Sequence, residues 1–169
     1  MLRLIIRGLV DGALSSLGVV IGASLSNDMA IVLSAGLSGA VANGFSNIMA
    51  AFTAEKTGRY VDLNKLEKKM MKSLKGTRHE RAIEKEVMKG GIYDGVASFF
   101  GGAIPILPFL FLDGTAALST AIGLVGVLAV VLGINTSLHS RENMFFSVTK
   151  MLVFTFATAG ICVSIQYLF

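Results

Sequence analysis

The chain begins its first apolar run with GLVDGALSSLG at residues 8–18 and repeats the pattern as GIYDGVASFFG at residues 91–101. Each copy opens an apolar stretch that is long enough to enter a bilayer, and each carries one acid, Asp11 or Asp94. An ionisable side chain inside the hydrocarbon costs roughly 2.5–3.5 kcal/mol even on a lenient insertion scale. Two acids placed at such a cost indicate a functional role.

Helical spacing puts four residues of each copy on a common face. In the first copy these are Asp11, Ser15, Gly18 and Gly22, and in the second they are Asp94, Ser98, Gly101 and Pro105. Each helix is therefore expected to present an acid, a hydroxyl group and a surface for close helix packing together.

Composition sets the class of protein. Of 169 residues, 53% are hydrophobic and 15% are charged, and the mean hydropathy is +0.70. These values are typical of an integral membrane protein, here a single membrane domain over residues 1–169. The net charge of +4 is concentrated beside apolar segments, so we interpret it as a topology signal rather than a nucleic-acid surface. The single cysteine, Cys162, excludes a disulfide or a CxxC metal site within one chain.

Five apolar segments are each able to cross about 30 Å of hydrocarbon. They cover residues 5–25, 29–54, 91–112, 115–138 and 144–169. We therefore predict an all-α integral membrane protein with five transmembrane helices, in which spans one and two are repeated in parallel by spans three and four. The first span also has the order of a signal peptide, but Asp11 interrupts it, so we expect it to belong to the folded core.

Basic residues lie on alternate connections. Arg3 and Arg7 precede the first span, residues 55–90 contain eleven Lys and Arg, and His139 and Arg141 lie between the fourth and fifth spans. The connections near Asn27 and Asp113 have no Lys or Arg. The positive-inside rule therefore predicts a cytoplasmic N-terminus and a cytoplasmic helical insertion at 55–90, with the C-terminus outside.

The second half of this insertion predicts a metal-capture site. Thr77 and Glu80 form a capping-box pattern, which starts a helix that we expect to end at Gly90-Gly91. Glu80, Glu84 and Met88 share one face of it, and two carboxylates with a thioether suit transient binding of Fe²⁺ or Mn²⁺. The alternative is a solvated basic hairpin with ordinary Glu–Lys pairing.

The second span has a small and polar face. Gly36, Ala40, Asn43 and Asn47 recur at three- and four-residue spacing, and Ser46 lies beside them. Amide and hydroxyl oxygens next to the Asp11 carboxylate suit a divalent cation that is losing its water. Hydrogen bonding between helices uses the same residue types and remains the alternative for the two asparagines.

Several motifs together resemble the vacuolar iron transporter family. They are DGxxSxxG from Asp11, AGL at 35–37 leading to Ala42 and Ser46, a cytoplasmic insertion, ASF at 97–99 and the proline-bearing GAIPILP at 102–108. The likeness covers nearly the whole chain. Lys150 also matches a basic residue that relatives commonly place ahead of a small-residue helix.

The resemblance implies a homodimer that exports Fe²⁺ or Mn²⁺ from the cytosol, in exchange for protons, along spans one and two. Asp11 matches the family's first-span acid, whereas Asn47 and Ala51 occupy positions where the family usually has methionine and glutamate. Met49 and Glu55 are nearby on the same helix. The implied partners are the lipid bilayer, a second copy and the transported ion, with no resident cofactor and no nucleic acid.

The expected transport-path residues are Asp11, Ser15, Asn43, Asn47 and Met49, and the other intramembrane polar residues are Asp94, Ser98 and Lys150. Two further classes are kept as alternatives. One is a membrane scaffold of the same fold without transport. The other is an intramembrane aspartyl protease that pairs Asp11 with Asp94, although the chain has no Gly-x-Gly-Asp element.

Overall fold

The computed structural model describes residues 2–26, 28–71, 73–112, 114–140 and 143–168. Its helices are α1 (Leu2–Ala23), α2 (Met29–Met70), α3 (Arg78–Ala103), α4 (Gly114–Ser140) and α5 (Met144–Gln166), with short 3-10 segments η1 (Ser24–Ser26) and η2 (Ile104–Leu110). All five α-helices, within these ranges, are long and apolar enough to cross a membrane, which confirms the all-α prediction. Asn27, Asp113 and Arg141, used above for topology, lie outside the described residues.

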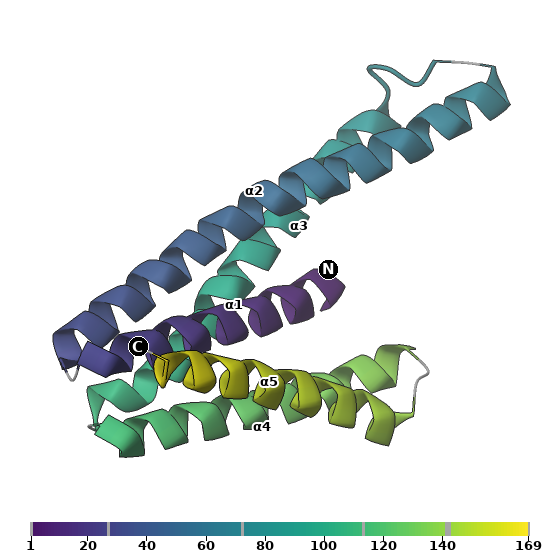
Figure 1. Ribbon diagram of the computed structural model, residues 1–169. Helices are drawn as coiled ribbons and strands as arrows, with labels where there is room; N and C mark the ends of the chain where they lie inside the picture. The colour runs from purple at the N-terminus through teal and green to yellow at the C-terminus, as the bar shows by residue number, and fades with distance from the viewer. Residues whose placement is uncertain (1, 27, 72, 113, 141–142, 169) are drawn as a thin grey trace.

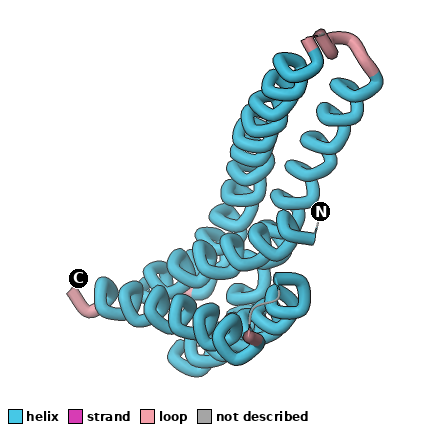
Figure 2. The backbone as a smooth tube through the Cα atoms, turned by 90° about the vertical axis from the view of Figure 1, so that its right-hand side faces the viewer, coloured by secondary structure: helices cyan, strands magenta, loops and turns pink. Residues whose placement is uncertain are grey.

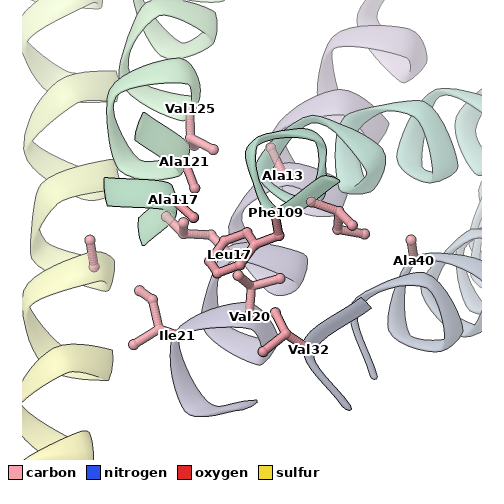
Figure 3. Close-up of a cluster of buried hydrophobic side chains, with 12 residues drawn as sticks. Ala13, Leu17, Val20, Ile21, Val32, Ala40, Phe109, Ala117, Ala121 and Val125 are labelled. Atoms are coloured by element: carbon pink, nitrogen blue, oxygen red, sulfur yellow. The ribbon is translucent and has the colours of Figure 1, made fainter. Parts of the chain in front are cut away.

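The main core is built around α1. Leu17, Val20 and Ile21 are fully buried there, and Phe109 from η2 and Val125 from α4 pack on the same cluster. Figure 3 shows these side chains gathered between α1, η2 and α4. The first span is therefore an integral part of the bundle, as the sequence predicts.

Helices α1 and α3 cross at very close range because glycines line the crossing. A Cβ atom at Gly8 would overlap the carbonyl oxygen of Asp94, and one at Gly12 would overlap that of Ser98. The contacts advance along both helices in the same direction. Spans one and three are therefore parallel, in agreement with the predicted repeat.

Helices α2 and α3 are longer than the sequence patterns predict. α2 runs unbroken for 42 residues, and α3 continues through Gly90 and Gly91, so the predicted helix end there is wrong. Both glycines are buried, Gly90 against Leu4 of α1 and Gly91 against α2. Close packing at these positions offsets the cost of about 1 kcal/mol for glycine within a helix.

Residues 55–90 therefore form a hairpin made of the extended ends of α2 and α3, which projects beyond the other helices (Figures 1 and 2). Leu63, Ile83 and Val87 form a small apolar cluster of their own inside it. Arg59 of α2 pairs with Glu86 of α3 at 3.2 Å. The hairpin thus has its own stabilising contacts.

The ends of the helices divide into two sets. The N-terminus lies on the side toward which the hairpin projects, together with the end of α4 and the start of α5, as Figure 1 shows. The C-terminus lies at the opposite end, near the end of α1 and the start of α2. This arrangement places the basic segments at one end of the bundle.

Candidate transport site

Asp11 is held by two amides from the neighbouring helix. Its Oδ2 atom accepts hydrogen bonds from Nδ2 of Asn43 at 3.0 Å and from Nδ2 of Asn47 at 2.7 Å. The first two spans thus meet at the carboxylate that the sequence selects as the path ligand. Both donors are neutral amides, so they fix the carboxylate in place and bring no positive charge to it.

Asn43 also connects the two sequence copies. Its Nδ2 atom lies 3.0 Å from the hydroxyl oxygen of Ser15 and 2.9 Å from that of Ser98. Ser15 and Ser98 occupy the same position in the two copies. The amide group of α2 therefore lies between equivalent hydroxyls of α1 and α3, with the Asp11 carboxylate beside it.

Small residues on α2 bring Asn43 and Asn47 within hydrogen-bonding distance of the neighbouring helices. A Cβ atom at Gly44 would lie 3.1 Å from the carbonyl oxygen of Gly95, so α2 and α3 approach almost backbone to backbone. Gly36 and Ala40 are buried on the same side of α2. The small and polar face predicted for this span is therefore the face that packs on the bundle.

The two copies differ in exposure. Asp11 and Ser15 are exposed on the surface of the single chain, whereas Asp94 and Ser98 are both 0% exposed. Equivalent faces of α1 and α3 thus have different surroundings, because α3 is enclosed by α1 and α2 while the Asp11 face of α1 is open. An open cavity of about 630 Å³ runs along this face and is lined in part by Arg7, Asp11 and Ser15.

Asp94 has a partner that the sequence analysis did not identify. The guanidinium of Arg7 donates to both carboxylate oxygens, with Nε 3.3 Å from Oδ1 and Nη2 in direct contact with Oδ2. From its position in the sequence, Arg7 is expected only to act as a topology charge. The available signal is that Arg7 lies one turn before Asp11 and follows the three apolar residues at 4–6, too deep for a simple flanking residue.

Met49 is the one expected path residue that lies apart from this network. It is 67% exposed and follows Asn47 by two residues, which turns it to another side of α2. Ala51, at the family's glutamate position, is fully buried, and Glu55 lies 4.0 Å from Arg59 on its own helix. Within one chain, neither Met49 nor Glu55 joins Asp11.

The hairpin glutamates already have partners. The hydroxyl of Tyr60 lies 3.4 Å from Glu80 and 3.2 Å from Glu84, and the other oxygen of Glu80 accepts from the Gly76 amide at 2.6 Å. The Thr77 hydroxyl caps the helix by accepting from the Glu80 amide at 3.5 Å, as predicted. Met88 is 53% exposed on the same helix.

The geometry does not favour two other kinds of site, an aspartyl protease centre and a cluster of metal ligands. Asp11 and Asp94 bind different partners, amides and a guanidinium, so they do not form the proton-sharing pair of an aspartyl protease. No group of three or more His, Cys, Asp or Glu side chains is placed to hold a metal ion in the part of the chain that the structure describes. Lys150 is exposed on α5.

A family model described as the VIT family matches residues 61–167. The chain belongs to the VIT family. Over 171 aligned residues it is also 41% identical to an uncharacterized protein of Methanocaldococcus jannaschii, with 99% of this chain and 89% of that protein covered. Membership confirms the resemblance seen in the sequence. It indicates a multi-pass membrane protein of a family of metal-ion transporters.

Proposed function

We propose that this VIT-family chain moves Fe²⁺ or Mn²⁺ out of the cytosol in exchange for protons, along a path that centres on Asp11. The observation that carries the proposal is the Asp11 carboxylate, which two neutral amides of α2 fix in place on an otherwise open face of α1. A fixed negative charge within a transmembrane helix, next to an open cavity, is suited to a passing cation.

The donor atoms around Asp11 favour these two metals. Carboxylate, hydroxyl and amide oxygens are all present in Asp11, Ser15, Asn43 and Asn47. An amide that now donates to Asp11 can rotate to present its oxygen when a cation takes the place of its hydrogen. Oxygen ligands suit Mn²⁺ and Fe²⁺, whereas Zn²⁺ prefers the histidine and cysteine ligands that this set lacks.

The charge distribution gives the orientation of the chain, and the family likeness implies the direction of transport, out of the cytosol. The basic hairpin and the N-terminus lie toward one end of the bundle, and the positive-inside rule assigns that end to the cytoplasm. The hairpin glutamates Glu80 and Glu84 then face the cytosolic metal pool. On this proposal the ion passes from the hairpin side, past Asp11, to the side of the C-terminus.

A second copy completes the path. In a single chain the Asp11 face of α1 would meet lipid, at the cost stated above for an intramembrane acid. Covering that face with the same face of another chain removes both carboxylates from lipid and doubles the number of ligands. We therefore propose a homodimer in which the two Asp11 faces lie across the interface.

The test is metal uptake into vesicles that contain purified protein. Asp11→Asn is expected to reduce Mn²⁺ and Fe²⁺ flux by about a hundredfold or more, because the amide keeps the volume but lacks the charge that replaces the ion's hydration. Asp28→Asn is the matched control. Asp28 caps α2 by accepting from the Ala30 amide, and asparagine caps a helix equally well.

A folded Asp11→Asn protein that transports like the wild type would refute the assignment of the path. A wild-type protein that carries neither metal, with or without a pH gradient, would instead support the scaffold alternative. Flux that is independent of the pH gradient would remove the proton exchange from the proposal and leave the metal path intact.

A further inference from the structure

An arginine and an aspartate form an ion pair within the bundle, close to the proposed path. Asp94 is fully buried, while the Arg7 side chain is 50% exposed. Two separate nitrogens of the guanidinium reach the two carboxylate oxygens, which is the strong, two-point form of this pair. The pair joins the first sequence copy on α1 to the second copy on α3.

Arg7 is also a close neighbour of Asp11. The two residues are four positions apart on α1, a spacing that makes side chains neighbours on a helix surface. Both of them line the open cavity of about 630 Å³. The long, flexible Arg7 side chain therefore has two carboxylates within reach, and in the structure it pairs with Asp94.

The carboxylate with which Arg7 pairs determines the net charge beside the proposed path. With Arg7 on Asp94 the two charges cancel, and Asp11 keeps its negative charge, since its hydrogen-bond donors Asn43 and Asn47 are neutral. With Arg7 on Asp11 the path carboxylate would be neutralised by a cation that cannot leave. Arginine stays charged in proteins, so it cannot escape by losing its proton.

We propose that Asp94 is a positioning residue that holds Arg7 away from Asp11 and thereby keeps the path carboxylate free for a divalent cation. This inference rests on the proposed transport function but concerns a different residue pair. It replaces the sequence-based view of Asp94 as a mere intramembrane polar residue. It also gives Arg7, which the family resemblance does not explain, a defined place in the mechanism.

The test is a set of three variants that separate charge from contact. In Asp94→Asn the freed Arg7 is expected to pair with Asp11 and to lower Mn²⁺ uptake at low metal concentration by about tenfold or more. Adding Arg7→Gln removes the competing cation, so the Arg7→Gln/Asp94→Asn protein is expected to recover most of the wild-type rate. Arg7→Lys/Asp94→Asn keeps a positive charge at position 7 and is expected to remain inhibited.

A second readout makes the test independent of transport. A hydrophobic carbodiimide reacts with a carboxyl group inside a membrane protein when that group transiently takes up a proton, which an unpaired carboxylate does far more often than one paired with a guanidinium. Mass spectrometry is expected to find the adduct on Asp11 in the wild type and in Arg7→Gln/Asp94→Asn, and to find little of it in Asp94→Asn. Thermal unfolding of each variant shows whether it is folded.

Two results would overturn the inference. A folded Asp94→Asn protein with wild-type uptake and wild-type labelling of Asp11 would show that Arg7 turns to solvent instead. Loss of uptake that Arg7→Gln does not rescue, with Asp11 still labelled, would make Asp94 a direct ligand of the ion. If the wild type carries no metal, the proposed function fails, while the labelling pattern still decides where Arg7 goes.

Discussion

At the scale of single residues, the hydroxyl of Tyr60 lies between the two glutamates that the sequence selects for metal capture. One hydrogen is shared between Glu80 and Glu84, at 3.4 and 3.2 Å. The tyrosine thus holds two acids of α3 close to α2 without neutralising either of them. On the proposed path, a dimer would present two such pairs to a cytosolic cation before it reaches Asp11.

We predict that Glu80→Gln/Glu84→Gln raises the apparent KM for Mn²⁺ by about two- to fivefold and leaves the maximal rate almost unchanged, because exposed carboxylates attract a cation through screened charge. Glutamine still accepts from Tyr60 and from the Gly76 amide, so the hairpin remains folded. The measurement is the concentration dependence of uptake.

The control for that variant is Asp62→Asn/Glu86→Gln, which removes the same charge from the hairpin at residues that pair with Lys65 and Arg59. An equal change in KM for both double variants would assign the effect to net charge alone. An unchanged KM in the glutamate variant would leave the hairpin as a solvated, topology-setting segment.

At the scale of helices, the crossing of α1 and α3 depends on Gly8 and Gly12. Both positions face backbone atoms of the other helix, which are unable to rotate away as a side chain does. The crossing also sets the site, since it brings Ser98 and Asp94 of α3 beside α1. A change of packing here would move the helices that position Asp11.

Gly12→Ala is therefore expected to destabilise the protein by about 1–3 kcal/mol or more, since the added methyl group overlaps the Ser98 carbonyl and forces the helices apart. Gly123→Ala on α4 is the control, because a Cβ atom there has no neighbour within 4 Å. Thermal unfolding in detergent is the measurement. Equal stability of the two variants would contradict the crossing described above.

At the scale of the whole molecule, the bundle leaves one polar face uncovered. On this face Asp11, Ser15 and Gly22 are exposed and Gly18, between them, lies near Cys162 of α5, whereas the equivalent face of α3 is enclosed. An uncovered acid beside uncovered glycine is the arrangement expected where a second chain packs. The apolar side chains exposed elsewhere on the helices are suited to direct contact with lipid.

We predict that Gly22→Leu dissociates the dimer while the single chain stays folded, because the position is open within one chain and only a second copy would collide with the leucine. The molar mass in detergent, measured by light scattering after size-exclusion chromatography, reports the result. Gly123→Leu is the control, since Gly123 on α4 is equally open and exposed.

A dimer that survives Gly22→Leu but not Gly123→Leu would move the interface from α1 to α4. A wild-type chain that is monomeric in reconstituted vesicles and still transports metal would remove the need for a second copy.

The order of apolar segments, their lengths and the repeated GxxDG pattern determine much of this protein by themselves. Five spans, their parallel repeat and the polar faces that carry Asp11 on α1 and Asn43 and Asn47 on α2 follow from local sequence, because helical periodicity already states which residues share a face. The VIT resemblance follows from the same motifs and is confirmed by the family match.

Only the tertiary structure decides which of the two equivalent acids, Asp11 or Asp94, is buried and which residue it pairs with. Arg7 and Asp94 are 87 residues apart, and no local pattern pairs them, since their contact depends on how closely α1 and α3 cross. The same holds for Gly90 and Gly91, where helix-breaking residues continue a helix because neighbouring helices pack against them. Local residue preferences determine the positions at which a helix can end. The packing energy between helices determines at which of these positions it does end, and that energy depends on residues distant in the chain.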